Sequence, residues 1–161
     1  MTTWNDLLSQ CPEIAGTVQQ RIDATGLAFL ATVRRDGFPR ISGIEPLFAL
    51  DELWLGMMPG SLKAKDLQRD PRLSLHNASE DKALEKGDVK ITGRAIEVTD
   101  QDTETAVRKA FADHTGYPPP AGPMHLFRVD VTELVTIRPD TDHLAIDTWH
   151  QGRGTNHIDR Y

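Results

Sequence analysis

Residues Leu53–Asn77, LWLGMMPGSLKAKDLQRDPRLSLHN, contain a complete strand–turn–helix–strand pattern. The apolar run Leu53–Met58 is typical of a strand, and the Pro-Gly pair after it ends that strand. Ser61 can cap a short helix over Leu62–Arg69, which the following Asp-Pro pair ends. A second strand is predicted over Leu73–Asn77.

The residues before this stretch predict a helix and two more strands. Pro12 suits a first helical position, and apolar residues then recur every four positions, so we expect a helix over 12–24 with a turn before it at 5–8. Strands are expected over 27–34 and 38–48. Tight turns at 35–37 and 51–52 would join these strands to the one over 53–58 as an antiparallel meander.

The residues after this stretch predict four more strands and a surface helix. We expect a loop over 78–87, a helix over 100–114, an irregular segment over 116–123, and strands over 89–98, 126–138, 144–149 and 156–160. A phase slip in the strand over 89–98 indicates a β-bulge, and Glu133 is the one polar break in the alternation of the strand over 126–138. The fold class predicted is α+β, mainly β, built on an antiparallel barrel or sandwich of six to eight strands.

Length and charge exclude several classes of protein. The chain has 161 residues, which predicts a single domain over 1–161. Its net charge of −6 argues against a nucleic-acid-binding protein, because neutralising phosphates needs a basic face. Cys11 is the only cysteine, so no intrachain disulfide can form. There is no apolar run of membrane-spanning length and no secretory signal pattern, so we expect a cytoplasmic protein.

The turn before the predicted helix over 62–69 is the sharpest candidate for a binding site. A glycine turn is followed by Ser61, Lys63 and Lys65 at the start of a helix, where free N–H groups and the positive end of the helix dipole can bind a phosphate. The pattern is not that of a Walker loop. The alternative interpretation is an ordinary helix cap followed by solvated lysines.

Other polar residues give weaker signals. His143, His150 and His157 recur every seven residues, a spacing that does not bring them together, so we interpret them as surface histidines and predict no metal site. No GxSxG nucleophile elbow or dinucleotide fingerprint occurs. Trp149 and Arg153 offer an indole to cover a planar ring and a guanidinium to pair with an anion, although a hydrophobic anchor is the simpler interpretation of the tryptophan.

The order of these motifs resembles one protein family. Leu27–Val33 followed by RDGFPR at 35–40, the SLKAKDLQRDPRLS stretch at 61–74, and VKITGRA at 89–95 are similar to successive signatures of the pyridoxamine 5′-phosphate oxidase-like split-barrel family. The similarity covers residues 25–99 and keeps the order, spacing and strand context of the motifs.

This resemblance implies a six-stranded antiparallel split barrel with flanking helices, an obligate homodimer, and a flavin mononucleotide (FMN) or deazaflavin F420 site at each subunit interface. Ser61 and Lys63 would hold the cofactor phosphate, with Lys65 close by. Met57 and Met58 would face the ribityl chain, and Trp149 and Arg153 would reach the partner's cofactor. The residues expected along the ring are Ser42, Gly43, Ile44, Glu45 and Pro46.

Two departures from the family pattern bear on the cofactor. Glu45 stands where flavin oxidases usually carry a basic residue, and Asp66 replaces a usual asparagine. Glu45 would repel an anionic flavin, and the short, acidic chain resembles the F420-using subgroup more than the vitamin B6 oxidases. The resemblance implies a cytoplasmic oxidoreductase acting on a small organic substrate. The alternative is a non-catalytic carrier or sensor of flavin, F420 or haem, in which His143, His150 or His157 would bind the haem.

Overall fold

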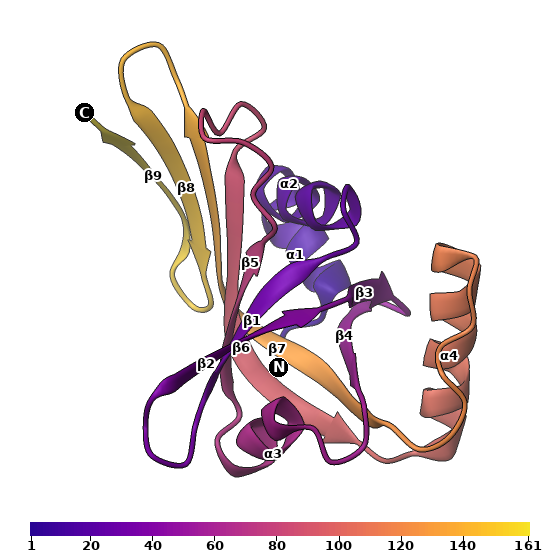
Figure 1. The fold of residues 1–161 in the computed structure, drawn as a ribbon. Coiled ribbons are helices and arrows are strands. Elements are labelled where there is room, and N and C mark those ends of the chain that lie inside the picture. The colour runs from indigo at the N-terminus through magenta and orange to yellow at the C-terminus, as the bar shows by residue number, and fades with distance from the viewer.

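The structure, a computed structural model, describes all 161 residues of the chain. It contains four helices and nine strands (Figure 1). In chain order they are α1 (Trp4–Gln10), α2 (Pro12–Asp23), β1 (Ala28–Val33), β2 (Pro39–Ile44), β3 (Pro46–Ala49), β4 (Glu52–Met57), α3 (Leu62–Arg69), β5 (Arg72–Asn77), β6 (Asp88–Val98), α4 (Gln101–Thr115), β7 (His125–Pro139), β8 (Leu144–His150) and β9 (Gly154–Arg160). None of the helices combines the length and hydropathy of a membrane-spanning helix.

The strands form one antiparallel sheet in the order β2-β1-β5-β6-β7-β4-β3, with the β8–β9 hairpin added to β7. The α+β, mainly β class is therefore confirmed. The sheet is open, since β2 and β3 end its path without pairing with each other, and it has nine strands rather than six. The long β7 connects the two parts of this nine-stranded sheet, because its first residues pair with β4 and its last residues pair with β8.

The two antiparallel pairings of the predicted meander are confirmed, but its middle strand is not continuous. The single strand expected over 38–48 is divided at Glu45 into β2, which pairs with β1, and β3, which pairs with β4. Pro46 has no N–H to donate to a ladder, which favours a break at this point. The β3–β4 hairpin then turns through Leu50 and Asp51, which both have positive φ, as a type I′ turn requires. Glu45 is thus the single residue over which the chain passes from one end of the sheet path to the other.

The bulge predicted in the strand over 89–98 is not in that strand, because the extra residue of the β6–β7 ladder lies on β7. The register shifts between Thr92 and Gly93, because Thr132 is an extra residue on β7. This insertion reverses the two faces of β7, so that Leu134 rather than Glu133 points into the core. A side chain at Gly93 would lie 2.5 Å from the carbonyl oxygen of Asp130, so the glycine permits the close approach of the strands.

The main core of 25 buried residues lies between the sheet and the first two helices. Where a turn was expected, α1 forms a full helix, because Thr3 and Asp6 make a capping box. A smaller cluster of Leu47, Trp54, Val107 and Leu126 lies under α4, which stands beside β3 and β4 (Figure 1). In contrast, β9 is exposed along its whole length, and the β8–β9 hairpin projects from the body of the molecule.

Candidate functional site

The turn between β4 and α3 has the geometry of an anion-binding site. Gly60 adopts a positive φ of 70°, and the Ser61 hydroxyl accepts a hydrogen bond from the N–H of Ala64. The N–H groups of Leu62 and Lys63 belong to the first turn of α3 and have no partner within the helix. They point, with the positive end of the helix dipole, toward the space in front of the helix.

Lys63 joins this turn to the end of β2. Its ammonium donates a hydrogen bond of 2.8 Å to the carbonyl oxygen of Gly43. Burial lowers the pKa of the Lys63 ammonium, and the charge of the nearby Glu45 carboxylate opposes that shift. Gly43 and Glu45, at the end of β2, therefore lie beside Ser61 and Lys63 at the start of α3.

The other predicted site residues have mixed positions. Met58 is 75% exposed at the mouth of this turn, and Lys65 is exposed on α3. Ser42 is half-buried on β2, whereas the side chains of Ile44, Pro46 and Met57 are buried. Trp149 is 3% exposed within the main core, and Arg153 is exposed in the turn between β8 and β9. The structure does not bring Trp149 and Arg153 to the α3 turn of their own chain.

A buried carboxylate fixes α3 against the sheet. Asp66 is 3% exposed, and it accepts hydrogen bonds from Thr32 on β1 at 2.9 Å, Arg40 on β2 at 2.7 Å and Arg69 at 3.2 Å. Burial alone would raise the pKa of the Asp66 carboxyl, but these hydrogen bonds outweigh burial and hold the pKa below its ordinary value. Sequence reasoning identified Asp66 only as a departure from a family pattern and missed its two arginine partners.

His125 is a second residue at this site that the sequence did not reveal. Its Nε2 atom lies 3.3 Å from the backbone nitrogen of Gly60, and its Nδ1 atom lies 2.8 Å from a carboxylate oxygen of Glu97. Gln68 donates to the same carboxylate from α3. His125 thus connects the start of β7 to the glycine of the anion-binding turn, 65 residues away in sequence. No local pattern predicts such a contact.

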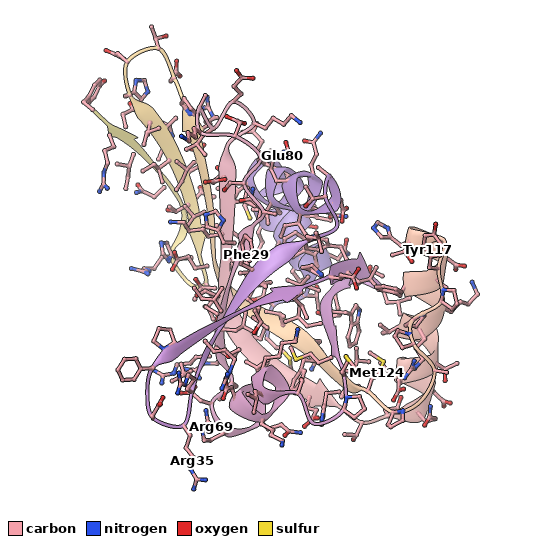
Figure 2. The ribbon with its side chains drawn as sticks, viewed as in Figure 1. Phe29, Arg35, Arg69, Glu80, Tyr117 and Met124 are labelled. Carbon is pink, nitrogen blue, oxygen red and sulfur yellow. The ribbon has the colours of Figure 1, made fainter.

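An apolar pocket of about 400 Å³ opens beside the turn, between α4 and the β3–β4 hairpin. Glu45, Met57, Met58 and Pro59 form the end nearest to α3. Met124 lies between β4 and α4 (Figure 2), and its methyl group would be 2.7 Å from any Cβ placed on Gly56. The pocket therefore shares three residues with the predicted cofactor site.

The histidines near the C-terminus lie apart from this site, on the β8–β9 hairpin. Asp159 contacts both His143, at 3.1 Å, and His157, at 2.9 Å. Hydrogen bonds from the His143 ring to Asp142 and from the His157 ring to Asp147, with further carboxylates around them, raise the pKa values of both imidazoles.

A larger, mainly polar cleft of about 850 Å³ separates this hairpin from α2 and touches none of the predicted cofactor residues. No group of three or more His, Cys, Asp or Glu side chains has the geometry to bind a metal ion.

The chain matches a family model over residues 14–138, and the family is described as pyridoxamine 5′-phosphate oxidase. Among curated proteins, none matches the sequence.

Solved structures share the fold at low sequence identity. PhzG from Burkholderia lata, in complex with tetrahydrophenazine-1-carboxylic acid, is 14% identical with a TM-score of 0.67, and the match covers 97% of this chain and 94% of PhzG. HutZ, the haem storage protein of Vibrio cholerae, is 19% identical with a TM-score of 0.59, over 82% of this chain and 91% of HutZ. An F420 reductase is 18% identical with a TM-score of 0.53, over 67% of this chain and 87% of the reductase.

Proposed function

The chain belongs to the pyridoxamine 5′-phosphate oxidase family, and on that premise we propose that it is an oxidoreductase that uses FMN or F420. It would transfer hydride between this cofactor and a small organic substrate. The observation that carries the proposal is the meeting of Ser61, Lys63 and the free N–H groups of α3 at the end of β2. Both cofactors carry a phosphate group, which suits this turn, and either would supply the hydride chemistry when bound.

The residues present fit a phosphorylated cofactor. The two free N–H groups at the start of α3 and the Lys63 ammonium offer hydrogen bonds and positive charge to a phosphate. Glu45 is exposed near Lys63, and the family resemblance places its negative charge beside the expected ring. A carboxylate there disfavours an anionic reduced flavin, which makes F420 the first choice of cofactor.

We propose that the protein acts as a homodimer, joined through the outer face of β1 and β2. Phe29 is 51% exposed and Ile41 is 72% exposed, and the β1–β2 register places them on the same face as Gly43. This apolar face therefore continues to the predicted cofactor strand. If the dimer forms here, Ile41→Glu should yield a monomer in sedimentation equilibrium, whereas Leu50→Glu, at an exposed residue of the β3–β4 turn, should remain dimeric. If both variants remain dimeric, the dimer interface does not lie on this face.

A fluorescence titration with F420 and with FMN tests the proposed function. Saturable binding of one cofactor at micromolar concentration is expected. Lys63→Ala should weaken that binding by about ten- to a hundredfold, because a hydrogen bond to a charged group contributes about 1.5–3 kcal/mol. Lys109→Ala, on the exposed side of α4, is the matched control and should bind normally. If neither cofactor binds below about 1 mM, the proposal is wrong.

A haem carrier is the competing function, and the structure of the hairpin argues against it. The rings of His143 and His157 are engaged by carboxylates on both nitrogens, and His150 lies 3.8 Å from Glu133. A haem iron would have to displace these partners. A Soret band on haem addition that is lost when all three histidines are replaced by alanine would favour the haem carrier instead.

A further inference from the structure

The pocket between α4 and the β3–β4 hairpin is lined mainly by large apolar side chains. They include Leu47, Trp54, Val107, Phe111, Met124 and Leu126. A protein interior is normally packed so closely that few voids exceed the size of a water molecule. An open volume of about 400 Å³ is instead within the range of small-molecule binding sites, which are also lined mostly by apolar and aromatic residues.

The outer wall of the pocket is built so that it does not collapse. It consists of the segment after α4, whose four prolines at 118, 119, 120 and 123 restrict the backbone. Arg108 on α4 donates hydrogen bonds to the carbonyl oxygens of Pro120, at 3.0 Å, and Gly122, at 2.6 Å. The same guanidinium pairs with Glu104 at 2.8 Å. A wall fixed in this way keeps the pocket open at no further cost when a ligand enters.

The charges at the pocket select the kind of molecule that can enter. The guanidinium of Arg108 is already engaged by Glu104 and two carbonyl groups, so it does not attract an anion. Glu45 is the other charged residue of the lining, whereas the Lys63 ammonium that interacts with it lies outside the lining and donates to the carbonyl oxygen of Gly43. The pocket therefore favours an uncharged or cationic molecule and disfavours a carboxylate or phosphate.

We propose that this pocket is the substrate site and that it binds an uncharged aromatic molecule of about the size of naphthalene. The assignment as a substrate site rests on the proposed function. The position of the pocket supports this assignment, because Glu45, Met57 and Met58 line the pocket and are also expected at the cofactor. A molecule held there lies next to the cofactor without occupying the anion-binding turn.

Equilibrium dialysis of the full chain loaded with cofactor tests the proposal. The probe is 2-naphthol, which is uncharged, and the control is 2-naphthoate, which has the same rings and a negative charge. We expect saturable binding of the naphthol and clearly weaker binding of the naphthoate. Val107→Phe places a ring inside the pocket from α4, and it should weaken naphthol binding by about tenfold or more. Ala106→Phe adds the same ring to the exposed side of the same helix and should bind as the unsubstituted chain does.

A third variant tests the charge. Glu45→Gln should raise the affinity for naphthoate by about two- to fivefold and leave naphthol nearly unchanged. Circular dichroism of each variant checks that it folds, and Ala121→Phe, in the exposed segment of the lining, replaces Val107→Phe if that variant does not. Unchanged naphthol binding in a folded, pocket-filling variant overturns the proposal.

Cofactor titration of the same variants separates the two proposals. Val107→Phe should bind F420 or FMN as well as the unsubstituted chain does. If naphthol and cofactor compete for binding, the pocket belongs to the cofactor and the substrate assignment is wrong. If naphthol binds in the pocket but no cofactor binds at all, the proposed function fails, and the assignment of the pocket to a redox substrate fails with it.

Discussion

The imidazole of His125 accepts a hydrogen bond from the backbone N–H of Gly60, with 3.3 Å between the two nitrogen atoms. Nδ1 of the same ring lies 2.8 Å from a Glu97 carboxylate oxygen, and an ionised carboxylate can only accept. The proton of the neutral ring is therefore on Nδ1, which leaves Nε2 free to accept from Gly60. Glu97 and His125 together hold the glycine turn that presents the start of α3.

Replacing His125 should weaken cofactor binding without removing any group that touches the phosphate. In His125→Ala, the Gly60 N–H loses its partner and the turn loses a hydrogen bond, whose net contribution is about 1 kcal/mol. We expect the dissociation constant for F420 or FMN to rise by about fivefold, measured by fluorescence titration. His114→Ala, at the C-terminal end of α4, is the control. An unchanged constant in His125→Ala would show that the turn keeps its shape without the ring.

Local signals predicted the elements around the site well. The helix over 62–69 was predicted to the residue, because a serine cap and an Asp-Pro pair act on their immediate neighbours. The irregular segment after α4 was predicted for the same reason, since prolines exclude regular structure wherever they lie.

The strand pairings and site contacts that depend on residues far apart in the sequence were not predicted. Both expected hairpins form, β1 with β2 and β3 with β4, but the break at Glu45 places β2 and β3 at opposite ends of the sheet path, so the strands do not make one continuous meander. The Glu133 break in β7 became clear only with the ladder, which shows Thr132 as the extra residue. His125 and Gly60 are neighbours for the same kind of reason, because their contact depends on β7 lying beside β4.

Asp66→Asn should destabilise the fold by about 1–3 kcal/mol at pH 7. The asparagine keeps the size of the side chain but removes the charge that Arg40 and Arg69 face. This loss of stability is smaller than that expected for a fully buried ion pair, because both arginines are partly exposed. Urea unfolding followed by tryptophan fluorescence measures the change. A loss below about 0.5 kcal/mol would mean that the Thr32 hydroxyl and the helix cap suffice to hold α3.

Asp66 also predicts how stability depends on acidity. Its pKa is lower in the folded chain than in the unfolded chain, so its contribution is complete above the unfolded pKa of 3.8 and is lost as pH falls through the folded value. Asp70, whose pKa the hydrogen bonds from Arg72 lower to about 2, acts in the same direction. The unsubstituted chain should therefore lose stability as pH is lowered below about 4, and Asp66→Asn should lose less over this range. If the free energy of unfolding falls equally with pH in the two proteins, the prediction is wrong.

The β8–β9 hairpin should have the opposite pH dependence. The pKa values of His143 and His157 are raised in the folded chain, so their contribution is complete below the unfolded pKa of 6.5 and is lost as pH rises through the folded values. Asp159 contacts both rings, so both titrations affect the same exposed hairpin. Amide hydrogen exchange, corrected for its intrinsic pH dependence, should show faster opening of this hairpin at about pH 9 than at about pH 6. Asp159→Asn should reduce that difference, whereas Asp113→Asn, on α4, should not. Equal protection at both pH values would show that the ladder alone holds the hairpin.

Arg108→Lys should loosen the wall of the apolar pocket while keeping its charge. A lysine cannot donate in the fork geometry that reaches the carbonyl oxygens of Pro120 and Gly122 together. The segment between α4 and β7 should then open more often, and the exposed bond between Ala121 and Gly122 within it offers a site for proteinase K, a protease of broad specificity. We expect cleavage there to be several times faster than in the unsubstituted chain, with little change in the midpoint of thermal unfolding, because α4 contributes only one fully buried side chain. Lys109→Ala, at the next residue of the helix, is the control. Equal cleavage rates in all three proteins would mean that the prolines hold the wall without Arg108.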